Sequence, residues 1–305
     1  MPGKSYSGDT TTPTVEELVL ANKLNVHVKI IAREEHNTLH PEALNNSAKY
    51  IEQQLAEIGY EVSLQPFRAG TQQVRNIEVE LKGKISPSEI IVIGAHYDSA
   101  QGAPGANDNA SGVALLIELA RFFKSTSPQK SLRFVFFTNE EPPFFGTDEM
   151  GSVVYAKRSK ERSENIVGMV SLETLGYYDD AKKSQKSPLF FRPFFPDKGN
   201  FVAFVGNFSS RQLVRNTINS FRVSTKFPSE GIVSYSHIIG IDWSDQYAFW
   251  RYGYPAVMLT DTALFRYPYY HTHNDTVDRV NYIKLAKVYG GTLAVVGDLA
   301  GASIK

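Results

Sequence analysis

The sequence predicts an α/β protein, a three-layer α/β/α sandwich with a mixed, mostly parallel central sheet. Short apolar runs alternate with longer segments of helical periodicity, which is the pattern of parallel strands that helices cover on both faces. We expect strands at the apolar runs 90–96, 132–140, 166–173, 201–207 and 255–261. The helices expected between and after these strands are 113–125, 209–221, about 243–252 and 282–300.

Two helices and a pair of strands are expected before this core. The first helix runs from about Thr14 to Arg33. In the second, apolar residues recur at helical spacing from Leu44 to Ile58, and Gly59 ends it. Segments 61–67 and 74–83 alternate between apolar and polar residues as strands do.

The chain is expected to hold one domain. Residues 1–13 form a polar tail, and residues 14–305 show no convincing second domain. Within them, residues 177–199 break the rhythm with prolines, charges and phenylalanines. A long irregular segment in a compact domain is more often functional than accidental. We therefore expect this insertion to contribute to function.

Composition excludes several classes of function. The chain has 32 basic and 32 acidic residues, so no overall field favours nucleic acid or an anionic membrane. It has no cysteine, which excludes disulfides, thiol catalysis and cysteine-bound zinc. Any bound metal must therefore rest on His, Asp and Glu side chains.

The location of the protein stays open. The first dozen residues are polar and lack the apolar core of a signal peptide, and no segment reaches the roughly 18 apolar residues of a membrane span. We expect a soluble chain without a membrane span. An extracytoplasmic place in a bacterium, with an export segment that this chain lacks, is compatible with these observations, and the oligomeric state is unknown.

Ionisable residues stand at the carboxyl ends of three successive strands, where open α/β sheets bind ligands. His96 ends the first, Glu140 and Glu141 end the second, and Glu173 ends the third. One such residue alone could simply be reaching solvent. Several converging carboxylates would repel one another unless a cation lay among them. The pattern therefore indicates a divalent metal.

Two aspartates near His96 extend this set. Asp108 lies in a glycine-rich loop, residues 102–112, just before a helix. By itself that loop is also an ordinary turn and helix start. Asp98 follows His96 by two residues, so on an extended segment it lies on the same side and could accept the second ring proton of the histidine. An aspartate in a turn is the alternative.

Six motifs occur in the order and with the spacing of one enzyme family. As a set they resemble the co-catalytic zinc aminopeptidases of metallopeptidase family twenty-eight, the bacterial leucyl aminopeptidase type. The resemblance covers roughly residue 43 to the C-terminus. The motifs are HYDS (96–99), GANDNASGVALLIELAR (105–121), FFTNEEPPFFGTDEMGSVVYA (136–156), SLETLGYY (171–178), SDQYAFWRYGYPAVML (244–259) and YHTHNDTVD (270–278).

The resemblance implies an exopeptidase with two Zn²⁺ ions per chain that removes the N-terminal residue of a peptide. It makes His96 and Glu173 ligands of one zinc, Glu141 and His271 ligands of the other, and Asp108 the bridge. Two metals can share one hydroxide and clamp both the attacking oxygen and the carbonyl oxygen. The resemblance also makes Glu140 the general base, Tyr270 a donor to the developing oxyanion, and the Asp108–Asn109 peptide bond cis. Tyr270 could instead be a packing residue.

The last ligand is the hardest to assign. His271 and His273 alternate, so spacing alone would let both bind one zinc. If Asp108 bridges the metals, one further histidine beside Glu141 is enough to give each zinc three protein ligands. The fourth position then stays free for the reacting water. The family match places the ligand at His271 and leaves His273 at a variable position. We therefore expect His271 to be the ligand.

The sequence departs from the family at two positions that bear on substrate preference. Glu173 stands where many members have Asp, and Gln246 stands where a His is common. The phenylalanines of the insertion could roof a pocket for apolar side chains, or form an interface or a packed flap. These are Phe190, Phe191, Phe194 and Phe195.

Other activities stay open on the sequence. A glutaminyl cyclase-like acyltransferase, which works with one metal, would use a related scaffold. A non-catalytic peptidase-like binding domain is a further alternative, although all six expected positions carry competent residues. Aminopeptidase, dipeptidase and carboxypeptidase specificities are not separable by sequence reasoning.

Overall fold

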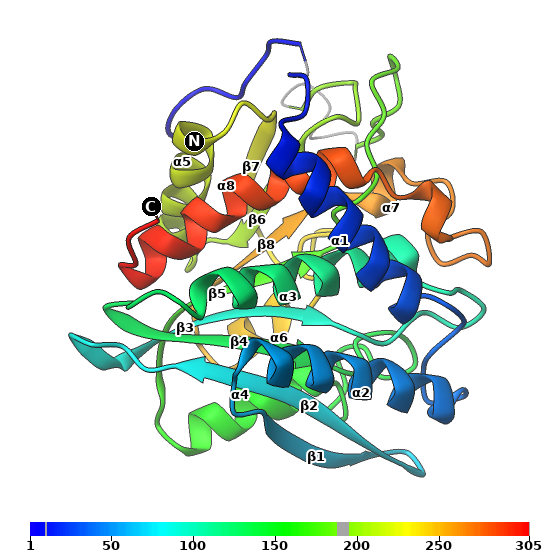
Figure 1. The fold of residues 1–305 in the computed structure, drawn as a ribbon, viewed down its shortest axis with the longest axis vertical. Coiled ribbons are helices and arrows are strands. Elements are labelled where there is room, and N and C mark those ends of the chain that lie inside the picture. Colours follow the sequence, from blue (N-terminus) through cyan, green and yellow to red (C-terminus); the bar gives the residue numbers. More distant parts are fainter. Residues whose placement is uncertain (10, 188–194, 305) are drawn as a thin grey trace.

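A computed structural model describes residues 1–9, 11–187 and 195–304. Its centre is one eight-stranded sheet in the order β1-β2-β4-β3-β5-β8-β6-β7 (Figure 1). The strands are β1 Ser63–Ala69, β2 Gln72–Leu81, β3 Ser86–His96, β4 Lys130–Phe137, β5 Asn165–Glu173, β6 Val202–Asn207, β7 Ser229–Ser234 and β8 Ala256–Thr260.

The middle of the sheet is parallel, as predicted. Strands β4, β3, β5 and β8 run in one direction, so their carboxyl ends meet at one edge. Strands β1 and β2 pair antiparallel at one side, and β2 also pairs antiparallel with β4. At the other side β6 is antiparallel to β8 and parallel to β7. The sheet is therefore mixed, with a parallel core that positions the site.

Helices cover both faces of the sheet (Figure 1). Apolar residues of five helices share one buried cluster with one face of the sheet; these are α1 Val15–Ile31, α2 Pro41–Ile58, α3 Ser111–Phe123, α5 Arg211–Ser224 and α8 Tyr282–Ala300. Two helices pack into a second cluster on the opposite face; these are α4 Gly151–Glu161 and α6 Gln246–Arg251. The predicted three-layer α/β/α sandwich is thus confirmed.

Successive residues of β3 show how the sequence builds three layers. Ile91, Ile93 and Ala95 point into the first cluster, whereas Ile90 and Val92 point into the second. Because both faces are covered, every position must be apolar, which explains the continuous hydrophobic run. His96 follows this run as the last residue of the strand.

The ends of the first two helices follow local rules. Thr14 begins α1 with a capping box, in which its side chain accepts from the Glu17 amide and the Glu17 carboxylate accepts from the Thr14 amide. Pro41 occupies the first turn of α2. Gly59 ends α2 with a φ of 95°, a left-handed conformation that glycine adopts without strain.

Three of the described α-helices and strands were not predicted, and several predicted boundaries move, one of them at the site. Strand β7 is a half-buried edge strand whose sequence SEGIVS carries little apolar signal, and α4 and the short helix α7 Ala263–Arg266 were also missed. The second apolar run leaves the sheet at Phe137, so Glu140 and Glu141 lie in the following loop rather than on the strand. No described helix is long and apolar enough to cross a membrane.

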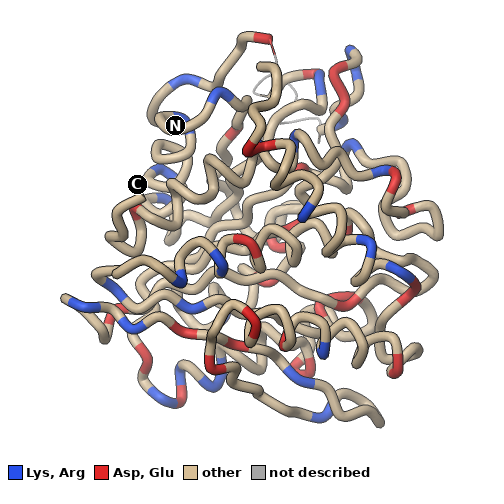
Figure 2. The backbone as a smooth tube through the Cα atoms, in the orientation of Figure 1, with Lys and Arg blue, Asp and Glu red and all other residues tan. Residues whose placement is uncertain are grey.

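The N-terminal tail packs against the domain. The Ser5 hydroxyl accepts a hydrogen bond from the Ser229 amide at 3.0 Å, and Arg222 donates to the Pro2 carbonyl at 2.9 Å. These contacts lay the start of the chain against α5 and β7. Figure 2 shows basic and acidic residues interspersed along the described chain, in line with its zero net charge.

Candidate metal centre

Six side chains converge at the carboxyl edge of the parallel strands. His96 ends β3 and Glu173 ends β5, while Glu140 and Glu141 follow β4. Asp108 lies in the segment η1 Ala106–Ala110 before α3, where its own backbone is not helical. His271 comes from the loop after α7, and its side chain is 34% exposed, whereas the other five residues are buried. The structure thus brings all the predicted ligands and Glu140 together.

These side chains form three possible three-residue groups among the described residues; one is His96, Glu140 and Glu141, and the other two share Asp108. In the first of the two that share Asp108, His96 Nε2 lies 3.4 Å from Asp108 Oδ1 and 3.3 Å from Glu173 Oε2. In the second, His271 Nε2 lies 3.2 Å from both Asp108 Oδ2 and Glu141 Oε2. Each oxygen of Asp108 therefore faces a different group.

Buried polar atoms at the centre lack hydrogen-bond partners in the described part of the chain. They are His96 Nε2, both carboxylate oxygens of Asp108, and Glu141 Oε1. A buried polar group without a partner is costly and calls for a specific explanation. Nitrogen and oxygen donors of His, Asp and Glu are ligands that zinc accepts. The donor set therefore fits divalent metal ions.

The electrostatics show how strongly the residues depend on one another. Burial raises the pKa of Glu141 to about 8, and burial also raises the pKa of Glu140 well above its usual range. Burial opposes protonation of His271, but the carboxylates of Asp108 and Glu141 outweigh it and raise the pKa of the imidazole to about 11. Without metal, glutamates and a histidine of the centre must therefore bind protons, which reduces the repulsion among the carboxylates.

Asp98 lies beside His96, but its contacts differ from those expected. The ring Nδ1 of His96 lies 3.1 Å from the main-chain oxygen of Asp98 and 3.6 Å from its carboxylate Oδ1. The two carboxylate oxygens instead accept the backbone N–H groups of Glu140 and Glu141, each at 3.1 Å. The Asp98 carboxylate thus fixes the loop that carries these glutamates, because two amides compete for it with the ring.

Asp275 makes the same kind of contact on the other side of the centre. Its Oδ1 accepts from the Asn107 amide at 2.8 Å, and its Oδ2 accepts from the Asp108 amide at 3.1 Å. The Tyr267 hydroxyl also donates to Oδ1 at 2.7 Å. Asp275 therefore ties the loop of His271 to the segment of Asp108. Sequence reasoning did not single out Asp275 and missed this contact.

The SDQ motif lies behind Glu173. The Ser244 hydroxyl donates to Glu173 Oε2 at 2.6 Å, which orients the longer side chain that stands in place of aspartate. Asp245 is fully buried, neither of its oxygens has a hydrogen-bond partner within the described residues, and burial raises its pKa to about 7. Gln246 donates to the Ile241 carbonyl at 3.0 Å. Sequence reasoning did not single out Ser244 or Asp245.

The remaining predicted residues divide between the centre and the surface. The Tyr270 ring stacks on the His271 ring with centroids 3.9 Å apart. Burial and the nearby carboxylates of Asp108 and Glu141 raise the pKa of its hydroxyl. His273 is exposed and belongs to none of the metal-binding groups found among the described residues. The peptide bond between Asp108 and Asn109 is cis, as expected.

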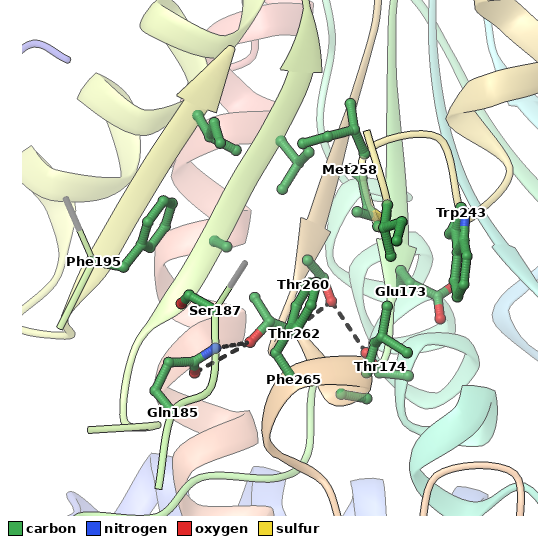
Figure 3. A pocket seen from close by; sticks show the side chains of 18 of the residues that line it. Glu173, Thr174, Gln185, Ser187, Phe195, Trp243, Met258, Thr260, Thr262 and Phe265 are labelled. Atoms are coloured by element: carbon green, nitrogen blue, oxygen red, sulfur yellow. Dashed lines mark hydrogen bonds between the residues drawn. The ribbon is translucent and has the colours of Figure 1, made fainter. Parts of the chain in front are cut away.

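An apolar pocket adjoins the centre at Glu173 and Tyr270 (Figure 3). It encloses about 720 Å³ including its open mouth, and Phe195 from the insertion lines it together with Trp243. Phe190, Phe191 and Phe194 lie outside the described residues. Further apolar lining comes from β6, β7 and β8 and from the segments around them, with Val205, Ile232, Ile241, Met258, Leu264 and Phe265.

A buried cluster of His, Asp and Glu at the carboxyl edge of such a sheet is the arrangement of a metal-dependent hydrolase. The family model described as "Peptidase family M28" matches residues 76–296. The chain therefore belongs to peptidase family M28, the metallopeptidase family that its motifs resemble. The uncharacterized protein YfbL of Escherichia coli K12 is 38% identical over 274 residues, which cover 85% of this chain and 83% of YfbL.

Solved structures share the fold at lower identity. The aminopeptidase from Aneurinibacillus sp. strain AM-1 superposes with a TM-score of 0.68 at 19% identity, over 92% of this chain and 94% of the other. The glutaminyl cyclase of Fimbriiglobus ruber gives a TM-score of 0.66 at 18% identity, over 95% and 99% of the two chains. The fold alone therefore accommodates both activities.

Proposed function

We propose that the protein is an aminopeptidase with two zinc ions, which hydrolyses the N-terminal peptide bond of peptides. The observation that carries this proposal is the position of Asp108, with Oδ1 toward His96 and Oδ2 toward His271. A carboxylate shared between two sets of ligands is the arrangement that a pair of metals requires. Bound zinc would supply a water of lowered pKa and polarise the scissile carbonyl group.

Glu140 is the proposed general base. It is buried, with Oε2 3.9 Å from His96 Nε2. It forms a possible group with His96 and Glu141 but is absent from the two groups that share Asp108. Asp98 holds its backbone amide and so fixes where the carboxylate stands. Glu140 would take a proton from the attacking water and pass it to the leaving amine. Tyr270, at the mouth of the apolar pocket, would donate to the oxyanion.

Charge supports cleavage from the N-terminus. The centre holds four carboxylates, those of Asp108, Glu140, Glu141 and Glu173, whose four negative charges equal the charge of two divalent ions, so the loaded centre has no net positive charge that would favour a substrate carboxylate. The described lining of the apolar pocket contains no Lys, Arg or His. A terminal carboxylate would thus find no cationic partner there, whereas an apolar side chain would fit. We propose that the first residue of the substrate is apolar.

Glutaminyl cyclisation is the second candidate, because the Fimbriiglobus ruber enzyme shares the fold. That chemistry, which the family resemblance associates with one metal, gives no reason for a second metal-binding group around His271. A zinc-to-protein ratio of two would favour hydrolysis. A ratio of one, with ring closure of N-terminal glutamine, would favour the cyclase.

The direct test is a peptidase assay on the zinc-loaded protein. A peptide with an apolar first residue should lose that residue, and its N-acetylated form should resist. C-terminal amidation should have little effect, and a chelator should abolish the activity. Cleavage of the acetylated peptide together with resistance of the amidated one would refute the N-terminal direction and indicate a carboxypeptidase.

A further inference from the structure

A second cleft opens on the other side of the candidate metal centre. Four segments surround it: the connection between α1 and α2, the turn between β1 and β2, the loop after β3 and the loop after β4. Its empty volume, about 1130 Å³ including its open side, is larger than the 720 Å³ of the apolar pocket. It therefore has room for a stretch of chain rather than one side chain.

The cleft and the apolar pocket reach the centre from different ends. Glu141 and Asp98 line the cleft, whereas Glu173 and Tyr270 line the pocket, and the two share no lining residue. Glu141 belongs to the group of His271, and Glu173 belongs to the group of His96. A peptide whose first side chain fills the pocket would present its scissile bond between the two groups. The residues after the scissile bond would then lie in the cleft.

We infer that this cleft binds the leaving part of the peptide and selects residues that follow the scissile bond. The inference rests on the proposed aminopeptidase function. It adds a site that discriminates the first residue after the cleaved bond by charge, and that favours substrates longer than a dipeptide.

The lining of the cleft mixes polar and apolar residues and includes no basic side chain among the described residues. Thr38, Thr71, Gln72 and Gln101 all line it, and their side chains make no hydrogen bond within the described chain. They therefore have donors and acceptors to offer a peptide main chain. No Lys, Arg or His is among the lining residues. A free carboxylate directly after the scissile bond, as in a dipeptide, would find no cationic partner.

The segments around the cleft carry charges of both signs: Arg68 Nε donates to the carbonyl of Gly70, which lines the cleft, at 3.0 Å, and two glutamates contact lining residues as well. Glu35 accepts from the side chain of Asn37 at 2.9 Å, and Glu149 accepts from the Gly70 amide at 2.8 Å. Both glutamates thus accept hydrogen bonds from residues that line the cleft. Asp98 and Glu141 belong to the lining itself, and like charges disfavour each other, so an acidic residue after the scissile bond should bind less well than a neutral one. The cleft thus fits neutral peptide segments.

The test compares substrates that differ only in the leaving part. The series uses leucine as first residue, followed by glutamine and glycine amide, by glutamate and glycine amide, or by glutamine alone with its free carboxylate. We expect kcat/KM to be highest for the first peptide and at least about threefold lower for the other two, the size of a single partly solvated charge interaction. Equal kcat/KM for all three would overturn the inference.

A charge reversal then places the effect in the cleft. Gln101→Lys should raise kcat/KM for the glutamate peptide and the dipeptide relative to the neutral peptide. Gln212→Lys, which adds the same charge on the exposed surface of α5, should leave the ratios unchanged. Equal ratios in both variants and the wild type would overturn the inference.

Leucine p-nitroanilide separates this inference from the proposed function, because its leaving group is not a peptide. The wild type and the surface control Gln212→Lys should cleave it at equal rates. Failure of the zinc-loaded wild type to cleave this substrate and the neutral tripeptide would refute the aminopeptidase proposal itself. Cleavage of both, with no preference among the three peptides, would refute only the role of the cleft.

Discussion

Asp275→Asn tests how the two ligand-bearing loops are held together. The Asp275 side chain is fully buried and accepts three hydrogen bonds, from the Asn107 and Asp108 amides and from the Tyr267 hydroxyl. Asparagine keeps the shape but replaces one acceptor oxygen by an NH₂ group. At least one donor then loses its partner, and the remaining bonds lose the negative charge. We expect Asp108 to be placed less firmly between the two groups.

The magnitude follows from the contacts. A hydrogen bond to a charged group contributes about 1.5–3 kcal/mol. If that loss falls on the metal-bound state, zinc affinity should drop by about 10- to 100-fold, the range typical when a partner that orients a metal ligand is removed. Because Asp108 faces both groups, both zinc ions should bind more weakly.

Competition with a chromogenic chelator at neutral pH measures the zinc affinity directly. Asp278→Asn is the matched control, because that carboxylate lies three residues further along the same segment and its side chain is 71% exposed. The control should keep the affinity of the wild type. The reasoning would be refuted if Asp275→Asn bound zinc with a dissociation constant within about twofold of the wild type and showed only a lower melting temperature. Asp275 would then stabilise the fold without positioning the metal ligands.

Three further perturbations address the centre itself. Glu140→Gln should keep both zinc ions but lower kcat by at least about 10²-fold, because it removes proton transfer and preserves shape; near-normal turnover would exclude Glu140 as base. His271→Ala should lose one zinc and nearly all activity, and His273→Ala should keep both metals; the reverse metal contents would reassign the ligand. With zinc removed by a chelator, the melting temperature should fall as the pH rises from about 5 to about 9. Folding raises the pKa values of Glu141 and His271, so the folded state binds more protons than the unfolded state in this range. The stability that these protons contribute is lost as the pH rises through the raised pKa values. A zinc-loaded sample should show a smaller fall, and equal pH profiles would contradict the electrostatic account.

The sequence identified the residues that end a strand or belong to a motif. His96 and Glu173 could be placed because continuous apolar runs reveal buried parallel strands, and the ends of such strands share one edge. The motif match supplied Asp108 and His271, whose positions depend on how two loops fold. Spacing alone had left His271 and His273 equivalent.

The contacts that position these ligands were beyond sequence reasoning. Asp98 was expected to bind the ring of His96 through its carboxylate, yet that carboxylate holds two amides of the loop after β4. Asp275 holds the segment of Asp108, which lies 167 residues away in the chain. Such hydrogen bonds leave no periodicity in the sequence, because they depend on backbone groups whose placement only the tertiary fold determines. The second cleft likewise arises from segments that meet only in the folded chain.

The central claim is that two zinc ions share Asp108. The most direct measurement is the zinc-to-protein ratio, by elemental analysis of protein loaded with zinc and freed of excess metal, for the wild type and for Asp108→Asn. We predict two zinc ions per chain in the wild type and a clear loss of both in the variant, because the charge of the bridging carboxylate offsets two cations. A ratio of one in the wild type, or an unchanged ratio of two in Asp108→Asn, would contradict the account.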